Sequence, residues 1–292
     1  MSKKRAKLIN GEVIAYQKKG YGEKVVLLVH GNMCSSEHYS TLLREINPTL
    51  YTVYALDLRG FGDSTYNSPI KTVSDLSNDI QLFINYMNIE TVYLIGWSAG
   101  GPVCLQLCID YPDLVEGIIL LSPVGFKGAP LQKKDQSGAN TGKYYDSKDE
   151  MAQDPEVSIP SKAIHNNDFI TLNNMWNLGI YTNKKPSNFI STLLINETLK
   201  QQNLEDIYWA LAHFNLSNEY NGYSQGDGQI KQINVPVLCF WGEQDLIIKF
   251  EDVKDIVNSL PYATLRVLKA CGHSPLVDHL DEILKGIDEM FG

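Results

Sequence analysis

Short runs of consecutive apolar residues recur along the chain, and polar or glycine-containing stretches separate them. The runs are rich in valine, leucine and isoleucine, and they lie at 25–29, 52–56, 92–95, 118–121, 237–240 and 265–268. A continuous run of this kind is typical of a strand that is buried on both faces, as in a parallel sheet. We therefore predict a buried strand at each of these positions.

The segments between the runs have helical periodicity. In 72–87 the apolar residues fall on one face of a helix, with Thr72 or Ser74 as the N-cap. That face comprises Leu76, Ile80, Phe83, Ile84 and Met87. Strands that alternate with helices indicate right-handed crossovers and a mostly parallel sheet with helices on both faces. The weaker alternation in 7–18 predicts an antiparallel hairpin at the edge of this sheet.

The alternation of strands and helices stops after Pro123 and resumes only at Val235. The intervening chain has helical patterns at 187–201 and 204–214, and a polar stretch at 132–150 that predicts a mobile surface loop. An insertion at this point of an α/β series lies over the carboxyl ends of the strands, where such folds bind ligands. We therefore expect an inserted helical cap.

This interruption predicts two domains. Residues 1–123 and 234–292 form a discontinuous α/β core, and residues 124–233 form the cap, or lid. We expect the core to supply the chemistry and the cap to select the substrate.

The strongest local motif is Gly-Trp-Ser-Ala-Gly-Gly at 96–101, directly after the predicted strand at 92–95. A serine in a tight strand-to-helix turn has strained backbone dihedrals, and only a tiny side chain fits two residues before it and two residues after it. Gly96 and Gly100 fill those two places. The helix that follows directs its free N–H groups toward the serine, which suits a developing oxyanion. We therefore predict that Ser98 is a nucleophile.

A serine hydroxyl needs a general base, and the base needs an acid that orients it. Among the six histidines, His273 lies on a glycine-containing loop just past the last apolar run. Asp245 ends a short loop after the run at 237–240 and is the candidate acid, with Glu243 as its rival. We predict that His273 is the base and that Asp245 orients it.

An oxyanion hole needs two backbone N–H donors. The N–H of Ala99 directly follows the nucleophile, and the N–H of Asn32 lies in the loop that ends the first buried strand. His30 in the same loop precedes the nucleophile and abuts the strand, so we interpret it as a brace for the loop and not as a base. We predict that Asn32 and Ala99 form the oxyanion hole.

Taken together, these motifs resemble those of the α/β-hydrolase superfamily, in the group with a helical cap after the sixth strand. The matching segments follow the family's order over nearly the whole chain, at 30–31, 57–64, 96–101, 242–245 and 272–273. The resemblance implies the α/β-hydrolase fold and a triad with the chain order Ser, Asp, His. Segment 57–64 matches the family's D-x-R-G-x-G-x-S turn, which we interpret as a glycine-permitted loop pinned by an Asp–Arg pair.

The resemblance implies a serine hydrolase, and we predict that it cleaves a carboxylic ester of small to medium acyl length through an acyl-enzyme. Dehalogenases and epoxide hydrolases of this fold are excluded, because they use Asp where this chain has Ser98. The same triad also suits a lactonase, a thioesterase or a hydrolase of carbon–carbon bonds in diketone-like ring-cleavage products. A function of a different class is a slow-turnover ligand receptor or interaction module of the same fold.

Substrate selection is expected from apolar and aromatic residues around the nucleophile and in the cap. The predicted pocket residues are Trp97, Met175, Trp176, Tyr181 and Trp209. An apolar pocket over Ser98 indicates an uncharged substrate. No metal is expected, since the chain has no His-Glu-x-x-His motif and its cysteines lack ligand spacing. No nucleotide cofactor is expected, since no G-x-G-x-x-G segment follows a strand.

The composition of the chain indicates which kinds of binding partner and which cellular compartment to expect. The chain has 25 Lys and Arg against 34 Asp and Glu, and this net charge of −9 disfavours binding to nucleic acid and to anionic membranes. No segment approaches the roughly 20 apolar residues of a membrane helix, and no secretory signal is evident. Five sparse cysteines fit reduced thiols. We expect a cytoplasmic enzyme with a small-molecule substrate, and the sequence does not specify an oligomeric state.

Overall fold

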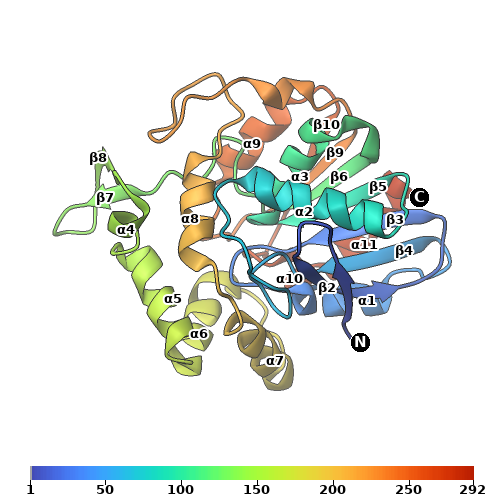
Figure 1. Cartoon of the computed structure of the whole chain (residues 1–292), viewed down its shortest axis with the longest axis horizontal. Helices are drawn as coiled ribbons and strands as arrows, with labels where there is room; N and C mark the ends of the chain where they lie inside the picture. Colours follow the sequence, from blue (N-terminus) through green and yellow to red (C-terminus); the bar gives the residue numbers. More distant parts are fainter. Residues whose placement is uncertain (1) are drawn as a thin grey trace.

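The computed structural model describes residues 2–292 and contains an eight-stranded sheet flanked by helices (Figure 1). The strand order is β1-β2-β4-β3-β5-β6-β9-β10, and the two pairs that involve β2 are antiparallel while the others are parallel. The strands are β1 Lys4–Lys7, β2 Val13–Lys19, β3 Lys24–Val29, β4 Tyr51–Leu56, β5 Val92–Trp97, β6 Val115–Leu121, β9 Val237–Gly242 and β10 Ala263–Leu268. The predicted strands and the mostly parallel sheet are confirmed.

The central strands are apolar on both faces because helices cover each face. The core helices are α1 Ser40–Glu45, α2 Val73–Tyr86, α3 Gly100–Asp110, α9 Phe250–Ser259, α10 Pro275–Asp278 and α11 Leu280–Phe291, with 3₁₀ turns η1 Ser36–Tyr39 and η2 Pro112–Leu114. In β3, Leu27 packs into the core formed with α2, α3 and α9, whereas its neighbour Leu28 packs into the core formed with α1 and α11. Both positions are therefore apolar, which explains the continuous runs.

Strand β10 departs from this pattern because it lies at the edge of the sheet. Only Leu268 of its residues is buried, and Val267 is 46% exposed. The prediction of a strand buried on both faces is wrong here, since β10 has a single neighbouring strand and solvent reaches much of its surface.

Helix α2 and the N-terminal hairpin agree with the local signals in the sequence. Thr72 and not Ser74 is the N-cap of α2, and it forms a capping box with Asp75. The helix buries its predicted face, which includes Ile80. Strands β1 and β2 form the predicted antiparallel hairpin, and Gly11 between them has a φ of 89° that favours glycine.

Between β6 and β9 the chain leaves the sheet and forms the mostly helical segment that we call the cap, residues 124–233 (Figure 1). Its elements are β7 Gln132–Lys134, β8 Asn140–Tyr144, α4 Lys148–Met151, α5 Pro155–His165, α6 Phe169–Met175, the π-helical turn η3 Trp176–Ile180, α7 Asn188–Thr198, α8 Leu204–His213 and η4 Gln229–Gln232. Helix α8 lies between the core and helices α4 and α5. Across residues 2–292, no helix has the length and apolar character needed to cross a membrane.

The polar stretch at 132–150 is on the surface, but it has regular secondary structure. Strands β7 and β8 pair across a turn in which Asp135 accepts a hydrogen bond from the N–H of Ser137. Ser147 then caps α4 by accepting a hydrogen bond from the N–H of Glu150. The predicted surface loop is therefore corrected to a hairpin and a short helix, because side-chain caps stabilise local structure that apolar periodicity does not reveal.

Candidate active site

The turn between β5 and α3 holds Ser98 in a strained conformation. Its φ is 53°, in the left-handed region that residues with side chains rarely adopt. The flanking glycines make this turn possible: a Cβ on Gly100 would lie 2.1 Å from the carbonyl oxygen of Val29, and one on Gly96 would lie 2.7 Å from the carbonyl oxygen of Gly100. The turn presents Ser98 to a cavity at the carboxyl ends of the strands.

His273 and Asp245 lie on two loops at this edge of the sheet, and their side chains are in contact. His273 Nδ1 is 2.9 Å from Asp245 Oδ2 and 3.1 Å from Oδ1. Glu243, the rival acid, is exposed and accepts a hydrogen bond from the N–H of Ala270 at 3.0 Å. The structure thus brings His273 together with Asp245 and not with Glu243.

The Asp245 carboxylate is shielded from solvent and fixed by its own loop. Its side chain is 0% exposed, and the N–H groups of Ile247 and Ile248 donate to its Oδ1 at 2.8 and 3.0 Å. Burial opposes ionisation, but the contact with His273 and these two N–H groups outweigh it and lower the pKa of Asp245 below its usual value. The stability that Asp245 contributes is therefore present at neutral pH and is lost only as the pH falls through this lowered pKa.

Two further residues hold the loop of His273, and neither was predicted to do so. Trp97 Nε1–H donates to the carbonyl oxygen of His273 at 2.8 Å. Asp278 accepts hydrogen bonds from the N–H of Gly272 and from the N–H of the cap residue Lys184, each at 2.8 Å. The contacts of Trp97 with His273 and of Lys184 with Asp278 join distant parts of the chain, so no local motif marks them.

The loop after β3 crosses directly over Ser98. A Cβ on Gly31 would lie 3.0 Å from Ser98 Cβ and 3.6 Å from Ser98 Oγ, so glycine allows this close approach. Asn32 follows in this loop, and Ala99 is the N-cap residue of α3. Within residues 2–292, no backbone carbonyl accepts a hydrogen bond from the N–H of Asn32 or of Ala99. Both groups lie near Ser98 without a backbone acceptor of their own.

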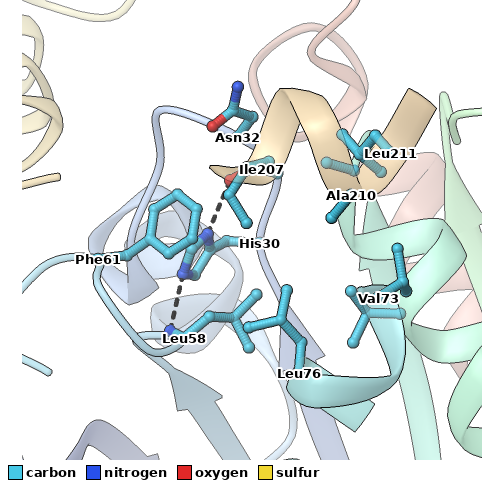
Figure 2. Close-up of a pocket in the computed structure, with 12 residues that line it drawn as sticks. His30, Asn32, Leu58, Phe61, Val73, Leu76, Ile207, Ala210 and Leu211 are labelled. Atoms are coloured by element: carbon cyan, nitrogen blue, oxygen red, sulfur yellow. Dashed lines mark hydrogen bonds between the residues drawn. The ribbon is translucent and has the colours of Figure 1, made fainter. Parts of the chain in front are cut away.

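His30 braces this loop through both of its ring nitrogens (Figure 2). Its Nδ1 is 2.8 Å from the carbonyl oxygen of Gly31, and its Nε2 accepts a hydrogen bond from the N–H of Leu58 at 3.0 Å. Burial lowers the pKa of His30 to about 4, so its ring is neutral at pH 7 and carries its proton on Nδ1. The small apolar cavity beside it, which Ile207 of α8 also lines, has a volume of about 10 Å³ and has no room for a substrate.

A cavity of about 200 Å³ opens over Ser98 and His273 between the core and the cap. Three predicted pocket residues, Trp97, Met175 and Trp176, line it. The other lining residues are Asn32, Met33, Cys34, Gly179, Ile180, Tyr208 and Ile247. Among the lining residues that the structure describes there is no lysine, arginine, aspartate or glutamate. The cavity is therefore mostly apolar, and its polar side chains are neutral or belong to the site itself: Ser98, His273, Asn32, Tyr208 and Cys34.

Two predicted pocket residues, Tyr181 and Trp209, lie outside this cavity. Tyr181 is 3% exposed and stacks on Trp176 with ring centroids 5.5 Å apart, so it supports the wall from behind. Trp209 packs against His213 with ring centroids 4.2 Å apart. Successive residues on a helix point about 100° apart, so α8 directs Tyr208 into the cavity and Trp209 away from it.

Six lining residues are not among the predicted site residues: Met33, Cys34, Gly179, Ile180, Tyr208 and Ile247. Each of them lies within two residues of a predicted site residue. Met33 and Cys34 follow Asn32, Gly179 and Ile180 precede Tyr181, Tyr208 precedes Trp209, and Ile247 follows Asp245. Their position in the chain could have identified them. Gly179 lies in the π-helical turn η3, which no feature of its sequence distinguishes from an α-helix.

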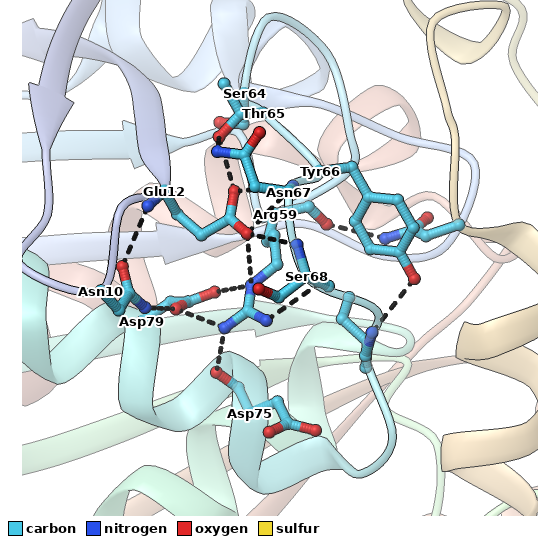
Figure 3. Close-up of polar contacts among 12 residues, drawn as sticks. Asn10, Glu12, Arg59, Ser64, Thr65, Tyr66, Asn67, Ser68, Asp75 and Asp79 are labelled. Atoms are coloured by element: carbon cyan, nitrogen blue, oxygen red, sulfur yellow. Dashed lines mark hydrogen bonds and ion pairs between the residues drawn. The ribbon is translucent and has the colours of Figure 1, made fainter.

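A buried ion pair holds the turn at 57–64. One partner, Arg59, belongs to the motif, and the other, Asp79, lies outside it. Arg59 Nε and Nη2 are each 2.6 Å from a carboxylate oxygen of Asp79 in α2 (Figure 3). Asp57 instead accepts a hydrogen bond from the N–H of Ser36 at 2.8 Å. The predicted Asp–Arg pair therefore joins the turn to the neighbouring helix α2.

Replacing Arg59 with methionine is expected to lower the free energy of unfolding by about 3 kcal/mol, because it leaves a buried carboxylate without its partner. That carboxylate, Asp79, is 1% exposed. Urea denaturation measures the change, and Arg44→Met on the exposed face of α1 is the control, with an expected change within about 0.5 kcal/mol. Equal stability of the Arg59→Met variant and the wild type would contradict this account of the turn.

Most of the sequence matches a known protein family. A family model with the description "alpha/beta hydrolase fold" matches residues 24–280. The chain is 26% identical over 269 residues to the dihydrolipoyllysine-residue acetyltransferase component of the acetoin cleaving system of Cupriavidus necator. That match covers 91% of this chain and 63% of the relative, so the chain spans less than two-thirds of the relative's length.

Two further comparisons cover nearly the whole chain. It is 22% identical over 284 residues to lipase 1 of Psychrobacter immobilis, a match that covers 94% of this chain and 79% of the relative. The structure of an esterase from Exiguobacterium antarcticum matches this chain with a TM-score of 0.73 at 18% identity. The match covers 98% of this chain and 97% of the esterase chain. The structural likeness shows that the two chains share a fold.

Proposed function

The chain belongs to the alpha/beta hydrolase fold family, and we propose that it is a serine hydrolase that cleaves carboxylic esters of small to medium, largely apolar substrates. The observation that carries this proposal is the contact between His273 and a buried, ionised Asp245 in the same site as the strained Ser98. Such a constellation activates a hydroxyl that is a weak nucleophile on its own.

In the first half of the reaction, His273 Nε2 removes the proton of the Ser98 hydroxyl as Ser98 Oγ attacks the ester carbonyl carbon. The carbonyl oxygen becomes an oxyanion, which the N–H groups of Asn32 and Ala99 stabilise. Asp245 holds the imidazole by its Nδ1–H and stabilises the imidazolium that forms.

The tetrahedral intermediate then breaks its bond to the leaving oxygen, which takes the proton from His273 and departs as the alcohol. The acyl group remains on Ser98 as an ester. His273 next removes a proton from water, the hydroxide attacks the acyl carbon, and Ser98 leaves with that proton. The products are one acid and one alcohol for each water consumed.

The cavity supports the substrate class. Its volume of about 200 Å³ is below the range of about 300–1,000 Å³ for sites that hold drug-sized ligands, which favours a small to medium acyl group. Its described lining contains no cation or carboxylate to pair with a charged substrate. Met175 and Trp176 of the cap contact the substrate in this proposal and select its shape.

A turnover panel tests the proposal: nitrophenyl esters of graded acyl length, acyl thioesters, lactones and a dienone-type diketone, each with wild type and Ser98→Ala. We expect the highest kcat/KM for short and medium esters and no turnover of them by the variant. Preferential turnover of a thioester, a lactone or the diketone would reassign the substrate class. No turnover of any of them would contradict the enzymatic role and favour a ligand receptor.

A further inference from the structure

The loop that carries the oxyanion donor Asn32 is tied to the cap. Directly after Asn32, Met33 has a φ of 60°, which is unfavourable for a residue with a side chain and has to be held by its surroundings. The N–H of Met33 donates to Asn32 Oδ1 and to Gln201 Oε1, each at 3.0 Å. Gln201 follows helix α7 of the cap, 168 residues further along the chain.

The side chain of Gln201 uses both ends of its amide in this contact. Its Nε2 donates to Asn32 Oδ1 at 2.8 Å and to Asn203 Oδ1 at 2.9 Å. Asn203 in turn donates to the carbonyl oxygen of Arg59 at 2.7 Å, which fixes it to the core. Gln201 is 5% exposed and is absent from the lining of the cavity over Ser98.

A second cap residue holds the same loop by its carbonyl group, whereas Gln201 holds the N–H. The Thr198 hydroxyl donates to the carbonyl oxygen of Met33 at 2.6 Å. The residue before it, Glu197, is 5% exposed and accepts a hydrogen bond from Lys3 Nζ at 2.5 Å, while Lys3 also donates to the buried Asp57 at 2.8 Å. The end of α7 is thus fixed to the core by buried polar contacts, so it can act as a rigid support.

We propose that Gln201 is a positioning residue that holds the backbone N–H of Asn32 in place for the oxyanion, with Thr198 as its partner on the same loop. The cap then contributes to the chemical step as well as to the shape of the cavity. This inference rests on the proposed function, because it assigns the support of a donor in that mechanism.

The contact predicts a specific kinetic effect. A donor that stabilises the oxyanion acts in the transition state, so its displacement lowers kcat and leaves substrate binding unchanged. Removal of an oxyanion donor costs about 10²- to 10³-fold in kcat, and loss of its support is expected to cost about 10- to 100-fold. KM is expected to stay within about twofold, since Gln201 does not reach the cavity.

The test compares Gln201→Met, which keeps the volume of the side chain and removes its amide, with Gln202→Met at the exposed neighbouring position. The substrate is the nitrophenyl ester that wild type turns over best. Gln201→Met is expected to show the loss in kcat, and Gln202→Met is expected to match wild type. Thr198→Val keeps the shape of its side chain, removes the bond to Met33 and is the second variant should Gln201→Met fold poorly.

A trifluoromethyl ketone with the same acyl chain adds a readout that a merely structural role would not change. It forms a hemiketal with Ser98 whose oxygen occupies the oxyanion position, so its inhibition constant should rise by about the factor by which kcat/KM falls. The inhibition constant of the product acid should stay constant in the same variant. Thermal melting shows that the compared variants are folded.

The outcomes separate this inference from the proposed function. The positioning role would be overturned if both Gln201→Met and Thr198→Val kept the wild-type kcat. It would also be overturned if KM rose while kcat stayed unchanged. Either result would leave the proposed function intact. Wild type that neither turns over esters nor is labelled by a fluorophosphonate at Ser98 would overturn the proposed function and this inference with it.

Discussion

Replacing Ser98 with alanine is expected to lower kcat for ester hydrolysis by about 10⁶-fold, to the residual level that binding and the oxyanion donors alone support. The hydroxyl is the only nucleophile in the proposed mechanism, so no other group can form the acyl-enzyme. The melting temperature should stay within a few degrees, because the strained turn at φ 53° depends on Gly96 and Gly100 and not on the Ser98 side chain. Initial rates and calorimetry measure the two quantities.

Ser122 provides a matched control for this variant. It follows β6, the strand next to β5, and its φ of 41° is also in the left-handed region. Its side chain is buried, and its Oγ has no hydrogen-bond partner within residues 2–292. Ser122→Ala should therefore keep full activity. Substantial hydrolysis by Ser98→Ala, or a loss in Ser122→Ala as large as that in Ser98→Ala, would contradict the assignment of the nucleophile.

The second large effect is expected for Asp245→Asn, with a fall in kcat of about 10⁴-fold. An asparagine has nearly the same shape, but it cannot stabilise the imidazolium, and its amide N–H groups favour the tautomer with the proton on Nε2. His273 would then be unable to remove the proton of Ser98. The rates should be measured from pH 6 to pH 9, since the loss should persist across this range.

Glu243→Gln is the control for Asp245→Asn. Glu243 is two residues away, is exposed and contacts the N–H of Ala270 instead of His273. The activity of the Glu243→Gln variant should stay within about twofold of the wild-type activity. The reverse result, with Glu243→Gln inactive and Asp245→Asn active, would show that the loop rearranges during catalysis and that Glu243 is the acid.

The parts of this fold that were predicted from the sequence depend on local patterns. Continuous apolar runs marked the strands because adjacent residues such as Leu27 and Leu28 face two different cores. Thr72, one of the two candidate N-caps, marked the start of α2 within a few residues. The turn of Ser98 was recognisable because two glycines are required at fixed distances from it.

The parts that were not predicted depend on contacts between distant segments. The partner of Arg59 is Asp79 because α2 packs beside the turn, and the sequence of the turn contains two closer aspartates, Asp57 and Asp63. The periodicity of α8 shows that Tyr208 and Trp209 point in different directions, but it does not show which one faces the cavity. The bond between Gln201 and Met33 likewise exists only once the cap is in place.

Formation of an acyl-enzyme on Ser98 is tested most directly by intact-protein mass spectrometry after rapid mixing with a nitrophenyl ester and acid quench. We expect one acyl group per chain on Ser98 in wild type, formed with the burst of nitrophenol, and none in Ser98→Ala. Peptide mapping of the adduct identifies the residue. Hydrolysis by wild type with no acyl adduct on Ser98, or with the adduct on another residue, would contradict the proposed mechanism.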